Sequence, residues 1–303
     1  MTDDGTERPD GGVSVSPSVE TGPPHGEAAD EGSNDTEAAS ELRGEELVIG
    51  YSSTDEPVIE GESIRVPPGE VTALVGPNGS GKSTLLKGLA DQLALDDGTV
   101  LVDGEAVHDL STKELARRLG LLSQHNVAPD SITVDKLVGH GRYPHRGFFE
   151  SVSEEDERAI DRAISLTGVE HLRHREVGSL SGGQKQLVWI AMVLAQETDV
   201  LLLDEPTTFL DLHHQLEVMD VVETLRDESD ITIVLVLHDI DQAARHADHM
   251  VALKDGRIHQ QGPPEAVVTE DVLADVFRID ADVEVTERGP RIEPLRAHHE
   301  DEV

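Results

Sequence analysis

The sequence contains no cysteine, and only 2% of its 303 residues are aromatic. The absence of cysteine excludes disulfide scaffolds, zinc ribbons and thiol nucleophiles. The scarcity of aromatics means that the hydrophobic core must be built mainly from Val, Leu, Ile and Ala. Apolar runs such as 231–237, which includes a Thr, are also short, whereas a transmembrane helix needs about 20 apolar residues. We therefore expect a chain that does not cross a bilayer.

Basic residues are scarce as well. Lys and Arg number 24 against 62 Asp and Glu, so the formal net charge is −38. This charge repels phosphate groups and excludes a nucleic-acid binder that works through a basic face. The N-terminus lacks the basic and then apolar segments of a signal peptide. We expect a soluble, intracellular protein with no nucleic-acid partner.

The acidic charge also indicates an environment. At ordinary ionic strength, repulsion among so many carboxylates loosens a compact chain. At molar salt the screening length falls to about 3 Å, and that repulsion largely disappears. Acidic clusters such as 154–157 recur within the body of the chain, so acidic tails alone do not account for the charge. The composition resembles that of proteins from salt-loving archaea that keep salt in the cytoplasm.

Sequence patterns divide the chain into three parts. Residues 1–43 are acidic, contain scattered Gly, Pro and Ser, and have no apolar periodicity, which predicts a disordered tail. Residues 44–280 alternate strand-like and helical runs, and within them strand patterns give way to helical ones at about 126–195. Residues 281–303 are expected to form a loosely structured tail, although Val283 and Val285 could form one further strand. This organisation predicts an α/β core with a helical insertion.

Individual elements follow from the same patterns. Strands are predicted at 46–50, 71–75, 99–102, 119–123, 200–203, 231–237 and 250–253, and helices at 82–93, 154–167, 182–195 and 213–226. The fully apolar runs suit parallel strands that are buried on both faces. The alternation at Ile64 and Val66 favours antiparallel pairing in the early strands.

The strongest motif is a glycine-rich loop between a predicted strand and a predicted helix. Its residues are Gly76, Pro77, Asn78, Gly79, Ser80, Gly81, Lys82, Ser83 and Thr84. Glycines let several backbone N–H groups converge on a phosphate, and the helix N-terminus adds partial positive charge. We expect Lys82 to reach the β- and γ-phosphates of ATP and the Ser83 hydroxyl to ligate Mg²⁺. The flanking strand and helix disfavour the alternative, a turn that merely caps a helix.

Two adjacent carboxylates follow the predicted strand 200–203. Parallel sheets bind their ligands at the carboxyl ends of the strands. We therefore expect Asp204 to hold Mg²⁺, directly or through water, and Glu205 to polarise the attacking water. An Asp-Glu pair after a strand is ordinary turn chemistry by itself, and it is the phosphate loop that favours a catalytic role.

A third motif opens the helix predicted at 182–195. Its residues are Leu180, Ser181, Gly182, Gly183 and Gln184. By itself it could be only a capping box, with Ser181 as the cap and Gln184 three residues further on. The motif also resembles the signature of ATP-binding-cassette (ABC) ATPases. It precedes the strand that ends at Asp204 by about twenty residues, as in that family.

This resemblance covers roughly residues 45–280 and implies further roles. Tyr51 is similar to the aromatic residue that stacks on adenine, Gln124 to the glutamine that contacts Mg²⁺ or water, and His238 to the histidine that contacts the γ-phosphate. Asp211 falls in the loop that crosses the dimer interface. The implied fold is a P-loop NTPase cassette with a RecA-like mixed sheet core, an antiparallel β subdomain and an inserted α-helical subdomain. The implied activity is ATP hydrolysis.

The resemblance also implies that one chain is incomplete. ABC ATPases clamp ATP between the phosphate loop of one cassette and the signature of another. This chain carries one of each, so the implied assembly is a homodimer that closes around two ATP. It would need two transmembrane permease subunits and, indirectly, an external substrate-binding protein. Its implied place is peripheral, at the cytoplasmic face of the cell membrane.

Two stretches, 139–147 and 206–215, resemble ATPase subunits of importers for iron–siderophore complexes, haem and cobalamin. The first stretch could also be a mere connection that is rich in Gly and Pro. The permease or the external binding protein selects the cargo, so the choice among these chelates stays open. A soluble ABC ATPase of the iron–sulfur assembly type shares every nucleotide motif and stays an alternative. The neighbouring His213 and His214 point in different directions on a helix, so we expect no metal site there.

Overall fold

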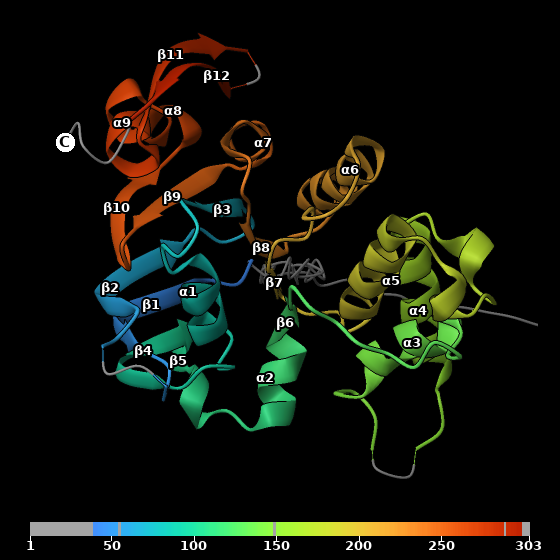
Figure 1. Cartoon of the computed structure of the whole chain (residues 1–303). Coiled ribbons are helices and arrows are strands. Elements are labelled where there is room, and N and C mark those ends of the chain that lie inside the picture. Colours follow the sequence, from blue (N-terminus) through green and yellow to red (C-terminus); the bar gives the residue numbers. More distant parts are fainter. Residues whose placement is uncertain (1–38, 54–55, 148–149, 288, 299–303) are drawn as a thin grey trace, which may run out of the picture. The chain divides into compact units, whose positions relative to one another are not determined.

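The computed structural model describes residues 39–53, 56–147, 150–287 and 289–298 (Figure 1). The acidic tail predicted for 1–43 lies mostly outside these residues. Its last part does not: Leu42 and Arg43 already belong to the first strand, β1 (Leu42–Ile49). Among the described residues, no helix combines the length and the apolar character needed to cross a membrane.

The core of the chain is a six-stranded sheet in the order β10-β9-β3-β8-β7-β6. Its strands are β3 (Val71–Val75), β6 (Leu119–Leu122), β7 (Val200–Leu203), β8 (Thr232–Val236), β9 (His249–Lys254) and β10 (Arg257–Gly262). All neighbouring pairs are parallel except β9 and β10. Every residue of β3, β7 and β8 is buried, which confirms that the apolar runs form parallel strands covered on both faces.

A second sheet is antiparallel, in the order β2-β1-β4-β5. It adds to β1 the strands β2 (Ile59–Val66), β4 (Leu95–Val102) and β5 (Glu105–Ala106). Ile64 and Val66 are buried and Arg65 between them is exposed, as the alternation predicted. One apolar cluster joins this sheet, the helix α1 (Lys82–Leu89) and one face of the six-stranded sheet. It therefore packs α1, the helix that follows the phosphate loop, between the two sheets.

The helices of the insertion pack on one another, as Figure 1 shows for α3 (Val134–Gly139), α4 (Glu154–Leu166) and α5 (Gly182–Leu194). The short helix α2 (Thr112–Arg118) precedes β6. The acids 154–157 occupy the first turn of α4, where negative charge complements the helix dipole. The buried face of α4 contains Ile160 and Ile164. The acidic run is thus a helix start above an apolar stripe, with Asp156 buried and the other three acids exposed.

The C-terminal part differs from expectation. After α6 (Leu212–Glu228), α7 (Ile240–His246), α8 (Pro264–Val267) and α9 (Glu270–Phe277), the strands β11 (Ile279–Thr286) and β12 (Gly289–Ala297) form a hairpin. The prediction of a loosely structured tail was therefore wrong for 281–286 and 289–297, whereas the strand considered for Val283 and Val285 is present as β11. Tertiary contacts order this hairpin. Ala281 and Ile292 are buried in the main core, and the Ile292 N–H donates to Asp241 of α7 at 3.2 Å.

Candidate active site

Glycines fix the shape of the phosphate loop between β3 and α1. Gly76 has φ +148° and Gly81 has φ +100°, in the region that L side chains rarely adopt. A Cβ on Gly76 would overlap the backbone oxygen of Leu253, and a Cβ on Gly81 would lie 2.8 Å from Ile59 Cδ1. The backbone angles therefore require glycine at both positions, and at Gly76 the backbone of Leu253 requires it as well.

Lys82 is held inside this loop. Its Nζ donates to the carbonyl oxygens of Gly76 at 2.8 Å and Pro77 at 2.9 Å, and the residue is 5% exposed. Burial lowers the pKa of Lys82, and the charges of Glu205 and Asp204 partly oppose that shift. The loop thus fixes the position of the ammonium group.

Asp204, directly after β7, is buried and only partly paired. Its Oδ1 accepts a hydrogen bond from Ser83 Oγ at 2.7 Å, whereas Oδ2 has no hydrogen-bond donor among the described residues and lies 4.0 Å from Lys87 Nζ. Burial raises the pKa of this carboxyl. A buried carboxylate oxygen without a donor, next to a hydroxyl, is an oxygen-only set that fits Mg²⁺.

Glu205 is oriented by three polar side chains. Its Oε1 lies 2.7 Å from His238 Nε2. Its Oε2 accepts from Gln124 Nε2 at 2.6 Å and from Thr208 Oγ1 at 3.1 Å. Glu205 also has φ +52°, a backbone strain of order 1–3 kcal/mol that persists only where surrounding contacts hold it. Gln124 and His238 were predicted from the sequence, and Thr208 was not.

The loop and the carboxylate border one cavity of about 300 Å³. It is lined by Tyr51, Val58, Asn78, Gly79, Gly81, Lys82, Ser83, Thr84, Glu205 and His238. The Tyr51 hydroxyl lies 3.2 Å from Thr84 Oγ1. The fold therefore gathers predicted residues from four separate segments around one hollow.

The signature residues do not line this cavity. Ser181 is the exposed N-cap of α5: its Oγ accepts from the Gln184 N–H at 3.3 Å, and Gln184 Oε1 accepts from the Ser181 N–H at 3.2 Å. The capping box is therefore confirmed as local structure. Asp211 is likewise an exposed N-cap, on α6. Within one chain, the described structure does not bring the signature to the phosphate loop.

Comparison with known proteins decides the family. The model of the family described as ABC transporter matches residues 59–208. The chain is 46% identical over 242 residues to the ferric enterobactin transport ATP-binding protein FepC of Escherichia coli (strain K12), covering 80% of this chain and 89% of that protein. The chain belongs to the ABC transporter family.

Two further comparisons agree with this family. The cobalamin import ATP-binding protein BtuD of Halobacterium salinarum is 43% identical over 209 residues, which are 69% of this ABC protein and 52% of the relative. A solved chain described as a metal-chelate type ABC transporter in an inward-facing conformation superposes with a TM-score of 0.72 at 26% identity, covering 85% of this chain and 98% of that one. The protein is accordingly an ABC-type ATPase with a P-loop cassette fold.

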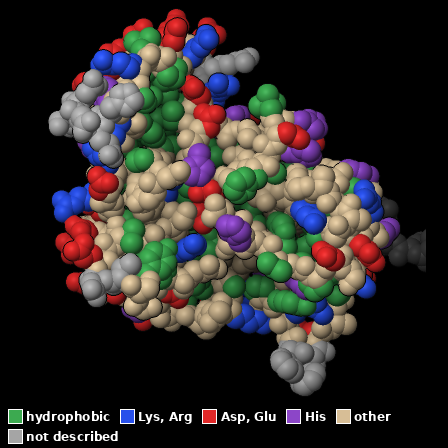
Figure 2. All heavy atoms as spheres, viewed as in Figure 1, with side chains coloured by type: hydrophobic (Ala, Val, Ile, Leu, Met, Phe, Trp, Pro, Cys, Tyr) green, Lys and Arg blue, Asp and Glu red, His purple; other side chains and the backbone are tan. Residues whose placement is uncertain are grey.

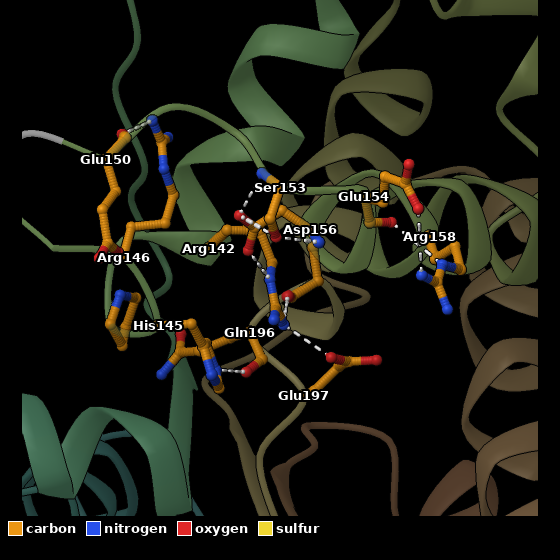
Figure 3. Close-up of polar contacts among 12 residues, drawn as sticks. Arg142, His145, Arg146, Glu150, Ser153, Glu154, Asp156, Arg158, Gln196 and Glu197 are labelled. Atoms are coloured by element: carbon orange, nitrogen blue, oxygen red, sulfur yellow. Dashed lines mark hydrogen bonds and ion pairs between the residues drawn. The ribbon is translucent and has the colours of Figure 1, made fainter.

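In this ABC ATPase, the stretch 139–147 centres on a buried arginine (Figure 3). Arg142 is 2% exposed; its Nε donates to Asp156 at 2.9 Å, and its Nη1 donates to the Ala195 carbonyl at 2.9 Å and to Glu197 at 2.7 Å. Asp156 also completes the capping box of α4 with Ser153. Arg142 therefore joins the start of α4 to the end of α5.

The turn after Arg142 also contacts α2. Lys113 Nζ donates to the Arg146 carbonyl at 3.0 Å, and Arg117 Nε donates to the Pro144 carbonyl at 2.9 Å. This turn thus bridges α2 and the helices of the insertion. It has an architectural role in addition to any role in partner binding that the resemblance suggests.

Proposed function

We propose that this chain is the ATP-hydrolysing subunit of an importer for an iron(III) chelate, and that it works as a homodimer. The observation that carries the proposal is the convergence of Gln124, Glu205 and His238 beside the phosphate loop. The similarity to the ferric enterobactin protein supports the class of cargo.

ATP would occupy the cavity that the phosphate loop borders. The loop N–H groups and Lys82 would bind the β- and γ-phosphates, and Tyr51 at the rim would stack on adenine. Ser83 and Asp204 would hold Mg²⁺, which supplies positive charge against the phosphate oxygens. The remaining loop residues, Asn78 and Thr84, would shape the phosphate cradle.

Hydrolysis would be directed by Glu205. Its carboxylate would accept a hydrogen bond from the attacking water, whose oxygen bonds to the γ-phosphorus as the bond from that phosphorus to the bridging β,γ-oxygen breaks. Gln124 and Thr208 hold one carboxylate oxygen. His238, next to the other oxygen, would contact the γ-phosphate. ADP and phosphate are the products.

The exposed signature supports the homodimer. Ser181 and the N-terminus of α5 do not line the chain's own cavity, and in a head-to-tail dimer they would donate hydrogen bonds to the γ-phosphate bound by the partner copy. The loop at Asp211 would cross the same interface. Each copy would supply groups that the other copy lacks at its own nucleotide.

A hollow on the insertion supports a permease partner. A cavity of about 420 Å³ is lined by the residues Ile132, Asp135, Lys136, Gly139, His140, Tyr143, Arg146, Val152, Glu157, Ile160 and Arg173. Tyr143 in this group is 59% exposed, although its neighbour Arg142 is buried. We place the contact with two membrane permease subunits here, which puts the chain at the cytoplasmic face of the membrane.

An uptake assay tests the cargo. In a strain that lacks this chain, we expect uptake of labelled ferric siderophores to fall to background and to return with the wild-type gene but not with Lys82→Ala. Cobalamin is the second candidate, because the relative from Halobacterium salinarum is a cobalamin import protein. Loss of cobalamin uptake alone would replace the first proposal with the second. Unchanged uptake of both cargoes would refute the importer and favour a soluble ATPase.

We also infer that the protein is adapted to high salt, and we expect activity to require it. Figure 2 shows acidic side chains spread over the visible face instead of gathered at one place, in line with the net charge of −38. At about 0.1 M KCl, where the Debye length is near 10 Å, carboxylate repulsion should unfold the chain and abolish turnover; molar KCl should restore both. Circular dichroism and phosphate release across a KCl series measure this. Full folding and activity at about 0.1 M would contradict the inference.

A further inference from the structure

The start of α6 lies against the signature motif through one side chain, that of His214. The ring of His214 packs on Gly183, the fourth residue of the signature, which is buried. A Cβ built on Gly183 would overlap the Cγ and Cδ2 atoms of that ring. Gly182 next to it has open space where a Cβ would stand. Of these two adjacent glycines, Gly183 is the one whose missing side chain makes room for His214.

The same imidazole also contacts the interface loop. His214 Nδ1 lies 2.8 Å from Asp211 Oδ1, and the backbone N–H of His214 donates to that same oxygen at 3.0 Å. These hydrogen bonds lower the pKa of Asp211. Gln215, the next residue, donates to the Leu210 carbonyl at 3.1 Å. The first turn of α6 therefore holds the loop from its C-terminal side.

We propose that His214 is a positioning residue. It fixes the position of the interface loop at Asp211 relative to the signature at Gly183 within each copy. The two segments come from different parts of the chain, and among the contacts described here the imidazole joins them directly. The inference rests on the proposed homodimer, in which both segments face the partner copy. A fixed spacing between them would let both dock on the partner at once, without the loss of freedom that ordering the loop entails.

The neighbouring His213 offers a matched control. Its side chain is 78% exposed and lies 3.5 Å from Glu217 on the same helix, whereas the His214 side chain is 22% exposed. The same substitution at the two positions changes the composition and helix propensity of α6 equally. The two rings meet edge to face with their centroids 5.4 Å apart, so both substitutions remove that contact. The difference between the two variants therefore reports the contacts of His214 to Asp211 and Gly183.

The test measures ATP-dependent dimerisation in a Glu205→Gln background in molar KCl. We expect His214→Ala to raise the protein concentration at half-dimerisation about tenfold, because the loop of each copy must then lose its freedom when the dimer forms. His214→Phe, which keeps a ring on Gly183, and His214→Asn, which keeps a donor for Asp211, should fall between His214→Ala and the parent. His213→Ala should match the parent, and all variants should bind ATP as monomers with unchanged affinity.

Three outcomes would count against the proposals, and they are distinguishable from one another. If the Glu205→Gln parent forms no dimer with ATP, the homodimer itself is refuted. If the parent dimerises and His214→Ala does so at the same concentration as His213→Ala, the positioning role is refuted and His214 serves only the start of α6. Weaker ATP binding by monomeric His214→Ala would also overturn the proposal, because the phosphate loop and its cavity do not include this residue.

Discussion

Replacement of Glu205 by Gln is expected to lower ATP turnover at least about 100-fold, the scale of general base catalysis, while ATP binding survives. Gln has the shape of Glu and can still pair with Gln124 and Thr208, so the backbone at φ +52° keeps its supports. It lacks the charge that orients water. The phosphate loop and Lys82 are untouched. The variant should therefore bind ATP, fail to hydrolyse it, and accumulate as a dimer.

Phosphate release and size-exclusion chromatography with and without ATP measure this result. Lys82→Ala is the companion variant: without the ammonium group held at the Gly76 and Pro77 carbonyls, it should bind ATP poorly and stay monomeric with or without it. A Glu205→Gln protein that is monomeric in both conditions would contradict the dimer. One that hydrolyses ATP at the wild-type rate would contradict the role of the carboxylate.

The second large effect concerns stability. Arg142→Met should lower the free energy of unfolding by about 3–5 kcal/mol, because it leaves the buried Asp156 carboxylate without its cation. Asp156 has a 5% exposed side chain and Glu197 a 35% exposed one, and the Ala195 carbonyl loses its donor as well. Arg142→Lys should recover only part of the loss, since one ammonium group cannot span the three acceptors as a planar guanidinium does. Denaturant unfolding in molar KCl measures both.

Arg158, shown in the same close-up (Figure 3), supplies the control. Its side chain is 67% exposed and lies 3.8 Å from Glu154, so Arg158→Met should change stability by no more than about 0.5 kcal/mol. Equal losses in Arg142→Met and Arg158→Met would show that the buried network does not stabilise the fold.

Acidic pH should reduce the difference in free energy of unfolding between wild type and Arg142→Met. Burial raises the pKa of Asp156, but hydrogen bonds from Ser153 and Arg142 outweigh it, and the net shift is downward. A lowered folded-state pKa gives stability that is present above the unfolded pKa of about 4 and is lost as the pH falls through the folded value. Below that range Asp156 is protonated in both proteins, and the missing cation matters less. Unfolding curves of both proteins at neutral and acidic pH measure whether this difference shrinks as the pH falls.

Much of the nucleotide site follows from local sequence. The phosphate loop is predictable because its glycines, lysine and hydroxyls act within nine consecutive residues whose neighbours signal a strand and a helix. The capping box at Ser181 and Gln184 is likewise a contact between residues three apart. The apolar runs of β7 and β8 indicate burial on both faces. In the phosphate loop and the capping box, the interacting residues are close in the chain, so the local sequence pattern is enough to predict the contact.

Thr208 is a site residue that could not be predicted from the sequence. It lies in the stretch 206–215 that was singled out, yet nothing in that stretch shows that its hydroxyl reaches Glu205. The C-terminal hairpin was missed for a similar reason: its short alternation is weak, and Ala281 and Ile292 become core residues only against the rest of the fold.

The sequence by itself determined the phosphate loop and the main strands and helices of the core, because short-range periodicity and spacing encode them, and its motifs carried the resemblance to the ABC family. Only the tertiary structure decided that Arg142 is buried among carboxylates, that Glu205 is held from three sides, and that His214 lies on Gly183. These contacts join residues that are far apart in the chain or depend on the exact course of the backbone. Their free energy depends on burial and distance, which exist only after the elements have packed.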